Sequence, residues 1–456
     1  MRAARRVARS GLALGSVDTT TLPDPPSLAF ARDCLNVSRL DERMRVSALK
    51  SHPVHVLEAH RKVLWDATSK WRGLPTHRYR GYGGPWIENL WIERFSPLPQ
   101  EAFGAFVPIF VQWVDYYHVQ KYHRAKAPSL RLGLIKLSSL MRPDIPYITV
   151  SQHDHGILNP ILKREDKQAA LRLTNLLVLS SGGNGHVPIP LLKQPEGLVP
   201  LPTGPPRRVL TFVGGVDGLR PARVALKHEL LQSSAFTPMQ REGVLFYSMN
   251  ASNGRWRDAL AESAVALTPR GQGRASYSMY EIVQMGMIPL YAWDDFEWLP
   301  YRGSKADWSG FGFSVRVGSF AQHASEIWAA VADPKQLKYR RDKLLALRAS
   351  HFTYDGVLDQ IARLLVNGTS EKDGSDLRCF PRAPLGGPFC HAWTGNFFAQ
   401  GLLQDCAPRW YPQDGLPPQR NFSWLRARQN GGRVPRRGTV INLSWNDGET
   451  AAMRIG

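Results

Sequence analysis

The 456-residue sequence has few acidic residues, little lysine and only four cysteines. Its 58 basic residues, 43 of them arginine, outnumber 38 acidic residues, so the formal net charge is +20. No run of 18 apolar residues occurs, and the sequence as written gives no transmembrane-helix signal. Hydrophobic residues make up 43% and charged residues 21%. This balance excludes a disordered chain, a coiled coil and a collagen, and it favours a globular protein of two or three domains.

The arginine excess indicates an anionic partner, such as nucleic acid, an acidic polysaccharide or a phosphate-bearing donor. Part of the positive charge lies in residues 1–17 and 407–456, and basic termini are more often solvated tails than binding surfaces. The other arginines are scattered, and no nucleic-acid-binding module is recognisable. We therefore expect no nucleic-acid partner.

The cysteines form no C-x-x-C pair, which disfavours a zinc site or thioredoxin-type chemistry. If the protein enters an oxidising compartment, we expect Cys379 to pair with Cys390 or Cys406. Five N-x-[ST] sequons favour the secretory pathway. They lie at Asn36, Asn250, Asn367, Asn421 and Asn442.

The first residues are rich in arginine, but their apolar run is too short for a signal peptide. They are either a transit-like peptide or a start that lacks an upstream anchor. We expect membrane association through such an anchor in the second case.

Alternating strand and helix patterns predict an α/β fold with parallel sheets, in which ligands bind at the carboxyl ends of the strands. We expect an irregular basic segment at 1–44 and a first domain at 45–205, with a Gly- and Pro-rich linker at 182–208. A second domain is expected at 206–367 and an irregular Gly-, Pro- and Trp-rich extension at 368–456. The expected strands are 147–151, 173–181, 209–213, 244–249, 265–269 and 288–293.

The most informative segment follows the expected strand 265–269. Gly271 and Gly273 let an anionic oxygen approach the backbone, and a helix that starts near Arg274 offers free N–H groups. Arg270 and Arg274 add forked positive charges that suit a diphosphate. The motif is neither a P-loop nor G-x-G-x-x-G, because Ser276 occupies the third glycine position.

Helical spacing then predicts that Arg274, Ser278 and Glu281 share one face, with Glu281 placed to bind ribose hydroxyls. The structural alternative is a glycine-rich turn in which Glu281 pairs with Arg274 or Arg270.

The run TPRGQGRASYSMYEIVQMGMIPLYAWDDFEWLP resembles the donor-side signature of exostosin-like glycosyltransferases. The segment LTFVGGVDGLR resembles the part that usually precedes it, and the similarity covers about residues 75–330. The resemblance implies a GT-B fold, with two Rossmann-like domains facing across a cleft, a nucleotide-sugar donor and inverting transfer. The donor-binding residues that it implies are Arg270, Gly271, Gly273, Arg274, Ser276, Glu281, Gly214 and Arg220.

No D-x-D motif occurs, so we expect a metal-independent site without a cofactor, in which arginines and the helix dipole offset the charge of the leaving diphosphate. The general base is expected after strand 147–151, at Asp154 with His153 beside it. Gln152 and His155 lie in the same loop, and Glu88 and Asp115 are rival candidates.

Together these patterns predict an inverting glycosyltransferase of the Golgi or secretory pathway. It would move a sugar, expected from a UDP-sugar, to a glycan or glycoprotein acceptor. The alternative is a catalytically inactive protein of the same fold that binds acidic polysaccharide.

Overall fold

The protein is described by a computed structural model, and its contacts divide the chain into a compact unit, Met1–Phe397, and a second unit, Phe398–Gly456. The described residues are 25–36, 49–74, 83–122, 133–154, 156–157, 173–193, 195–199, 206–216, 220–232, 243–247, 256–380, 440–444 and 450–454. In the second unit, β10 (Val440–Ser444) pairs antiparallel with β11 (Thr450–Arg454). Within the described residues no helix is long and apolar enough to cross a membrane.

The first sheet of the large unit has four parallel strands in the order β1-β2-β3-β4. They are β1 (Val107–Pro108), β2 (Tyr147–Ser151), β3 (Leu176–Ser180) and β4 (Val187–Pro188). Every residue in these strands is buried, as is typical of a parallel sheet covered on both faces. Successive residues of β2, such as Tyr147 and Ile148, pack into two different cores.

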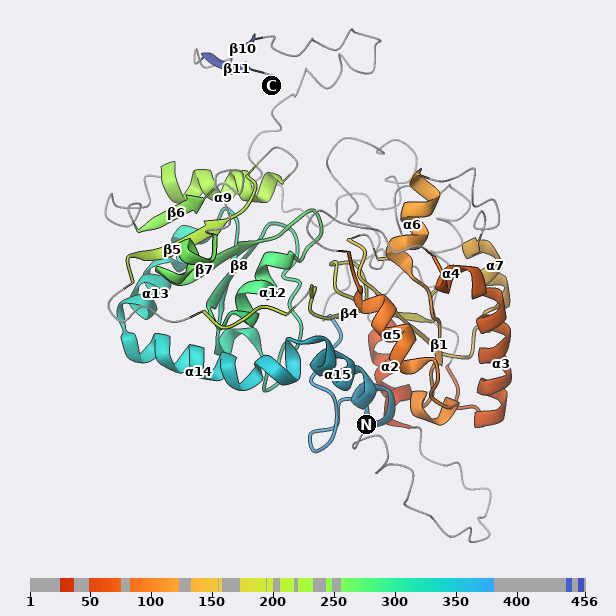
Figure 1. The fold of residues 1–456 in the computed structure, drawn as a ribbon. Helices are drawn as coiled ribbons and strands as arrows, with labels where there is room; N and C mark the ends of the chain where they lie inside the picture. Colours follow the sequence, from red (N-terminus) through yellow and green to blue (C-terminus); the bar gives the residue numbers. More distant parts are fainter. Residues whose placement is uncertain are drawn as a thin grey trace. The chain divides into compact units, whose positions relative to one another are not determined.

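Helices cover both faces of this sheet (Figure 1). They are α2 (Pro26–Asn36), α3 (Val54–Ala67), α4 (Ser69–Arg72), α5 (Ile87–Phe95), the 3₁₀ helix η2 (Gln100–Phe103), α6 (Trp113–Tyr122) and α7 (Gly133–Leu140).

The second sheet has five parallel strands in the order β6-β5-β7-β8-β9. They are β5 (Arg208–Val213), β6 (Val244–Tyr247), β7 (Ser263–Pro269), β8 (Ile288–Trp293) and β9 (Phe313–Arg316). The order corresponds to 2-1-3-4-5, so the direction of winding reverses between β5 and β7. The predicted α/β fold with parallel sheets is confirmed, and β9 is an addition to the predicted strands.

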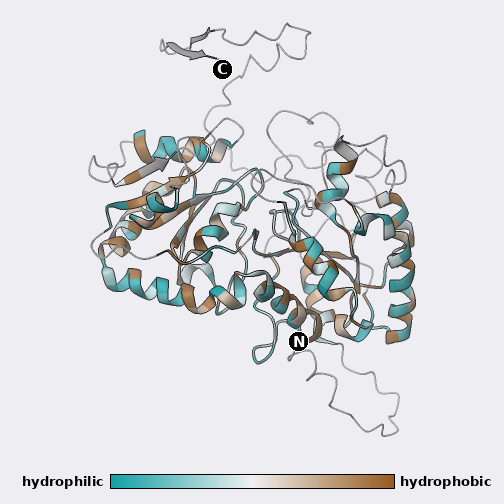
Figure 2. Ribbon diagram, in the orientation of Figure 1, coloured by the Kyte–Doolittle hydropathy of each residue, from teal (hydrophilic) through white to brown (hydrophobic). Residues whose placement is uncertain are grey.

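The helices of this half are α9 (Pro221–Gln232), α11 (Trp256–Ala261), α12 (Tyr277–Gln284), the 3₁₀ helix η6 (Trp308–Gly310), α13 (Phe320–Ala332), α14 (Pro334–His351) and α15 (Tyr354–Asn367). α14 is mostly hydrophilic, whereas the strands beside it are hydrophobic (Figure 2). Its start is fixed by Asp333, whose carboxylate accepts the N–H of Lys335, with Pro334 as its first residue.

The chain returns to the first sheet through α15 (Figure 1). The Thr353 hydroxyl accepts the N–H of Gly356 at the start of this helix, and Gly368, with φ of 58°, follows its end. Residues of α15 spaced three or four apart, such as Val357, Ile361 and Leu364, are fully buried. They pack on α2, α5 and η2, so elements of both sheets share one hydrophobic core.

The structure differs from the predicted boundaries in three places. Residues 26–36 form a helix, although 1–44 were expected to be irregular, because Leu28, Ala31 and Leu35 are spaced to bury one face. The first half of the expected linker is buried and contains β4, since prolines are tolerated in an edge strand. Residues 374–380 belong to the folded unit: the N–H of Phe380 donates to the carbonyl of His186 at 2.8 Å.

A disulfide joins Cys34 of α2 to Cys379, with the Cα atoms 5.3 Å apart and a sequence separation of 345 residues. The expected pairing of Cys379 with Cys390 or Cys406 is therefore wrong, and both of these partners lie outside the described residues. The physical reason is the return of α15 to α2, which brings the end of the folded unit to its first described helix.

We expect the double variant Cys34→Ser, Cys379→Ser to lose about 2–4 kcal/mol of unfolding free energy, because the disulfide restricts a very long loop in the unfolded chain. Chemical denaturation of both proteins without reductant measures the difference. Equal midpoints would contradict this disulfide, and wild type measured with reductant provides the matched control.

Candidate functional site

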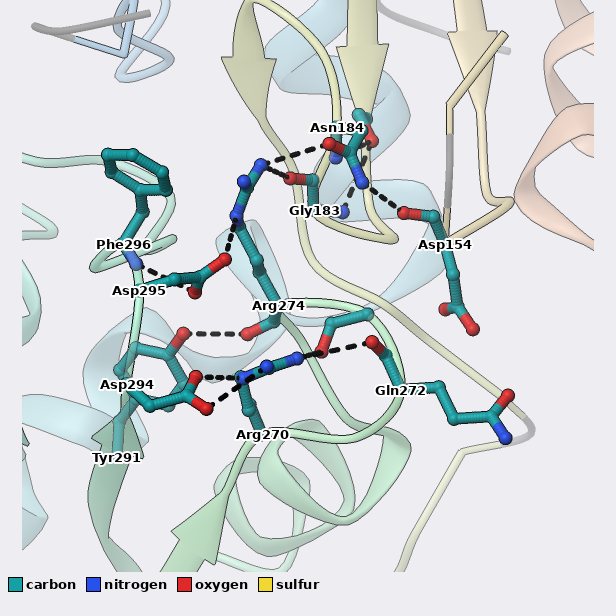
Figure 3. Close-up of polar contacts among 12 residues, drawn as sticks. Asp154, Gly183, Asn184, Arg270, Gln272, Arg274, Tyr291, Asp294, Asp295 and Phe296 are labelled. Carbon is teal, nitrogen blue, oxygen red and sulfur yellow. Dashed lines mark hydrogen bonds and ion pairs between the residues drawn. The ribbon is translucent and has the colours of Figure 1, made fainter. Parts of the chain in front are cut away.

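Loops at the carboxyl ends of β2, β3, β7 and β8 meet between the two sheets (Figure 3). The backbone N–H of Arg274, after β7, donates to the carbonyl of Gly182, after β3, at 3.1 Å. A Cβ atom on Gly182 would lie 2.7 Å from the N of Asp154, and one on Gly273 would lie 2.7 Å from its Oδ1. Both contacts are too close for a side chain, so glycine is needed here to let the loops touch.

Arg274 is buried, with 3% of the residue exposed, and its guanidinium group connects the loops of the second sheet to those of the first. Its Nε donates to Asp295 at 2.9 Å, and its Nη1 donates to the carbonyl of Gly183 at 2.6 Å and to Oδ1 of Asn184 at 3.0 Å (Figure 3). The Phe296 ring lies over the group, with its centroid 4.7 Å from Cζ. Arg274 was expected to bind a diphosphate. Here its Nε and Nη1 donate to these protein acceptors and tie the loops together, while its buried Nη2 has no hydrogen-bond partner among the described residues.

The carboxylate of Asp295 is the charged partner of Arg274. Burial raises the pKa of Asp295, but the positive charges of Arg274 and Arg270 lower it by more. The pKa of Asp295 therefore lies below its ordinary value. The pair is therefore ionised at neutral pH.

Arg270 lies at the end of β7 and holds a carboxylate in a forked geometry. Its Nε and Nη2 both donate to Asp294, the second at 3.1 Å, and its Nη1 donates to the carbonyls of Gln272 and Gly273. The side chain is 17% exposed, compared with 4% for the side chain of Arg274. An arginine guanidinium can also bind a phosphate group through two parallel hydrogen bonds. Of Arg270 and Arg274, Arg270 is therefore the one that is suited to an anionic ligand.

Helix α12 starts at Tyr277, three residues later than expected, with Ser276 as its N-cap. No side chain caps its first turn; the hydroxyl of Ser276 instead lies 3.2 Å from that of Ser278. The N–H of Gly271 donates to the carbonyl of Ala275, which folds residues 270–276, the β7–α12 loop, into a tight bend. This bend places a helix N-terminus beside Arg270, a combination that favours anions.

Glu281 was expected to share a helix face with Arg274 and to bind ribose hydroxyls. Because α12 begins at Tyr277, Arg274 is not part of that face. Glu281 instead forms an ion pair of 2.5 Å with Lys193, whose Nζ lies 5.3 Å from the ring centroid of Tyr277. Neither of the two arginines named in the structural alternative is therefore its partner.

Asp154 follows β2 and lies against the β7–α12 loop. Asn184 donates to its backbone carbonyl, and its carboxylate faces the Cα of Gly273. Burial raises the pKa of Asp154 to about 6, and the positive charge of Arg270 acts in the opposite direction. A carboxylate with this pKa is suited to accept a proton near neutral pH.

His153 and His155 are the residues next to Asp154 in the sequence. The His153 ring lies edge-on to Tyr117, with the centroids 4.9 Å apart. His155 lies outside the described residues.

Glu88 and Asp115, the rival candidates, are fully buried. Glu88 accepts the N–H of Gln152 at 2.6 Å and that of Val114 at 2.9 Å. Burial raises its pKa to about 8, although these N–H groups lower it. Gln152 in turn donates to the hydroxyl of Tyr277 at 2.9 Å. Glu88 therefore holds the backbone of the loop that carries Asp154, through the N–H of Gln152. Its carboxyl group is buried and does not line the surface.

Gly214 and Arg220 follow β5, and the residue that links this region to Arg270 is Arg223, which the sequence analysis missed. The Nε of Arg223 donates to the carbonyl of Arg270 at 3.0 Å. The N–H of Arg223 donates to the carbonyl of Arg220 at the start of α9. The sequence signal that could have identified Arg223 is its position three residues after Arg220, at the start of an expected helix.

No family model and no curated protein matches the chain. Among solved structures, the structure of TarM is 8% identical with a TM-score of 0.30 and covers 50% of this chain and 52% of its own. A structure of the GtfA/B complex is 9% identical with a TM-score of 0.26 and covers 48% and 45%. The chain thus spans about half the length of these structures. Similarities of this size define no family, and the site is interpreted from its own geometry.

The described residues contain no group of three or more His, Cys, Asp or Glu side chains arranged to hold a metal ion. What the site does bring together is a carboxylate, an arginine fork and a helix N-terminus, from loops of two sheets. This combination can hold a phosphate ester and accept a proton from a nearby hydroxyl group.

We expect the stability of the protein to fall between about pH 4 and pH 6 because of Asp154. Its folded pKa of about 6 lies above the ordinary value of 3.8, so in this window the native state holds a proton that the unfolded state has released. The stabilisation is complete below pH 4 and is lost as the pH rises through 6, by about 1–3 kcal/mol for this partly exposed group. Urea denaturation of wild type and Asp154→Asn from pH 4 to pH 7 measures it. Parallel curves for the two proteins would contradict the raised pKa.

Proposed function

We propose that the chain is an inverting glycosyltransferase that moves a sugar from a nucleotide-sugar donor to a hydroxyl group of a glycan or glycoprotein acceptor. The observation that carries the proposal is the meeting of Asp154, from the first sheet, with the β7–α12 loop of the second sheet. Proton acceptor and anion-binding loop come from the carboxyl ends of strands in two separate parallel sheets. A GT-B arrangement has this property, since donor and acceptor bind to different Rossmann-like domains.

On the donor side, the proposal assigns the diphosphate to Arg270 and the N-terminus of α12; the N–H groups of Arg270, Gly271 and Arg274 already donate to protein carbonyls. The diphosphate would replace the carboxylate of Asp294 on the arginine fork. Gly273 is buried against Gly182 and Asp154, so the proposal places the diphosphate at the partly exposed fork of Arg270. A UDP-sugar is the donor of choice for the first tests.

On the acceptor side, Asp154 accepts the proton of the acceptor hydroxyl group. The acceptor oxygen forms a bond to the anomeric carbon, while the bond from that carbon to the diphosphate breaks on the opposite face. The leaving nucleoside diphosphate takes the bonding electron pair, and Arg270 and the dipole of α12 stabilise its charge without a metal ion or cofactor.

We also propose that the protein acts in the Golgi or elsewhere in the secretory pathway, held there by an N-terminal anchor. The Cys34–Cys379 disulfide supports an oxidising compartment.

One observation favours the second candidate, a non-catalytic protein that binds acidic polysaccharide. Arg270 and Arg274 both have carboxylate partners, which a donor diphosphate would have to displace. Binding of heparin without consumption of any nucleotide sugar would support this candidate.

The donor is identified by thermal stabilisation with a panel of UDP- and GDP-sugars, since a ligand that binds the native state raises the apparent melting temperature. With the most stabilising donor, we expect Arg270→Ala to lower turnover at least about 100-fold, because it removes the charged donor aimed at the leaving group. Arg207→Ala, which breaks an exposed ion pair with Glu262 in the same half, is the matched control and keeps full turnover. Unchanged turnover in Arg270→Ala, or no stabilisation by any donor, would refute the proposal.

Asp154→Asn is expected to lower kcat about 10²–10⁴-fold with little change in donor affinity, because the amide accepts no proton. In wild type, kcat/KM is expected to rise with pH through about 6, where the carboxyl group ionises. An Asn variant with wild-type kcat would exclude Asp154 as the base.

A further inference from the structure

The winding of the second sheet reverses between β5 and β7, and ligands of open parallel sheets bind in the crevice beyond such a point. Two loops flank the crevice. One follows β5 and contains Gly214 and Gly215; the other is the β7–α12 loop, which begins at Arg270. Within the described part of the chain, a buried side chain connects them.

That side chain is Arg223, in the first turn of α9, which is 8% exposed. Its Nε donates to the carbonyl of Arg270 at 3.0 Å and its Nη1 donates to the carbonyl of Gly215 at 3.2 Å. Its Cζ lies 5.3 Å from the ring centroid of Phe212, in β5. One guanidinium group thus fixes the backbone at the starts of both loops.

Gly214 fits this arrangement. A Cβ atom here would lie 2.7 Å from Cζ of Phe212 and 3.4 Å from Nη1 of Arg223, and the φ of 158° is close to extended backbone. The absence of a side chain at Gly214 therefore makes room for the Phe212 ring beside Arg223. This gives Gly214 a role in the packing of the loop, alongside the donor-binding role expected from the sequence.

The chemistry of the contact requires arginine. Arg223 reaches the two carbonyl oxygens with two different nitrogen atoms, Nε and Nη1, which a planar guanidinium holds at a fixed spacing and a lysine, with one nitrogen, does not. A lysine would keep the charge and part of the stem while leaving one buried carbonyl without this donor.

We propose that Arg223 is a positioning residue that fixes the β7–α12 loop for diphosphate binding. It acts through the backbone of Arg270, whose side chain is assigned to the donor, and in this respect the inference rests on the proposed function. Without the two hydrogen bonds of Arg223, the β7–α12 loop can move relative to β5. The guanidinium of Arg270 is then no longer held in the position that binds the diphosphate.

The chain offers a matched control in Arg340 of α14. Its Nη1 donates to the carbonyls of Ser309 and Gly312 at 2.9 and 3.0 Å, and its Cζ lies 4.3 Å from the centroid of Phe313. Arg340 therefore makes the same kind of contact, two backbone carbonyls and one aromatic ring, at the β9 edge of the same sheet. Arg340→Lys reports the general cost of such a change.

The test compares Arg223→Lys, Arg340→Lys and Arg270→Ala in the full chain. Hydrogen–deuterium exchange is measured on peptides that cover residues 270–276, and UDP binding is measured by calorimetry. For Arg223→Lys we expect exchange in this loop at least tenfold faster and UDP affinity about tenfold weaker than in wild type. For Arg340→Lys we expect wild-type values in both measurements, whatever its melting temperature.

Wild-type exchange in the loop of Arg223→Lys would overturn the inference, and so would a UDP affinity equal to that of Arg340→Lys. Arg270→Ala separates the two levels of the argument. If UDP binds wild type and Arg270→Ala equally well, the proposed function fails. If Arg270→Ala loses UDP but Arg223→Lys does not, the role of Arg223 alone is refuted. If wild type binds no UDP, the exchange rates still decide whether Arg223 fixes the loop.

Discussion

The junction between the two sheets depends on the buried guanidinium group of Arg274. A charge with almost no exposure is tolerated only where protein groups replace its water. Asp295 provides the opposite charge, and Gly183 and Asn184 provide oxygen acceptors from the other half of the chain. Because these groups come from loops after β3 and β8 and Arg274 itself follows β7, the Nε and Nη1 of Arg274 gain their acceptors only when the three loops meet, and the buried Nη2 has no partner among the described residues. The guanidinium of Arg274 fixes how the loops of the two sheets meet. The shared hydrophobic core and the packing of α15 on the first sheet add further contacts between the same parts of the chain.

Two consecutive acids at the end of β8 divide the arginines between structure and chemistry. Asp295 holds the buried Arg274, whereas Asp294 holds the more exposed Arg270. The two carboxylates are similarly exposed, at 25% and 28%, so the pairs differ in their arginines, 4% exposed for Arg274 and 17% for Arg270. Removal of Asp295 would leave a buried guanidinium without its charged partner, which is expensive. This difference in the exposure of the arginines is why the proposed function assigns the ligand to Arg270.

The sequence predicted the parts of the fold that depend on local pattern. Buried apolar runs such as YITVS and VALTP gave the strands, and the helix after Gly273 was expected within three residues of its start. The carbonyl partners of Arg223, and Gly183 as a partner of Arg274, were not predictable, because every residue carries a backbone carbonyl and no motif marks it. Asn184 and Asp295, the side-chain partners of Arg274, depend on how loops distant in the sequence meet. The Cys34–Cys379 pair was hidden for a related reason: it depends on where α15 packs, over a separation of 345 residues.

The β7–α12 loop is held from two sides, by Arg274 against the loop after β3 and by Arg223 against the loop after β5. Both contacts use side chains that are almost fully buried, while Arg270 remains partly exposed in its pair with Asp294 and the start of α12 has no side-chain cap. Stabilisation of a leaving diphosphate requires dipoles that are already in place, because reorientation during the reaction would consume the gain. A loop fixed at both ends meets this requirement, so under the proposed function Asp154 would face a donor whose position the loop sets. In that proposal Arg223 and Arg274 act by holding the loop, and Arg270 is assigned to the diphosphate.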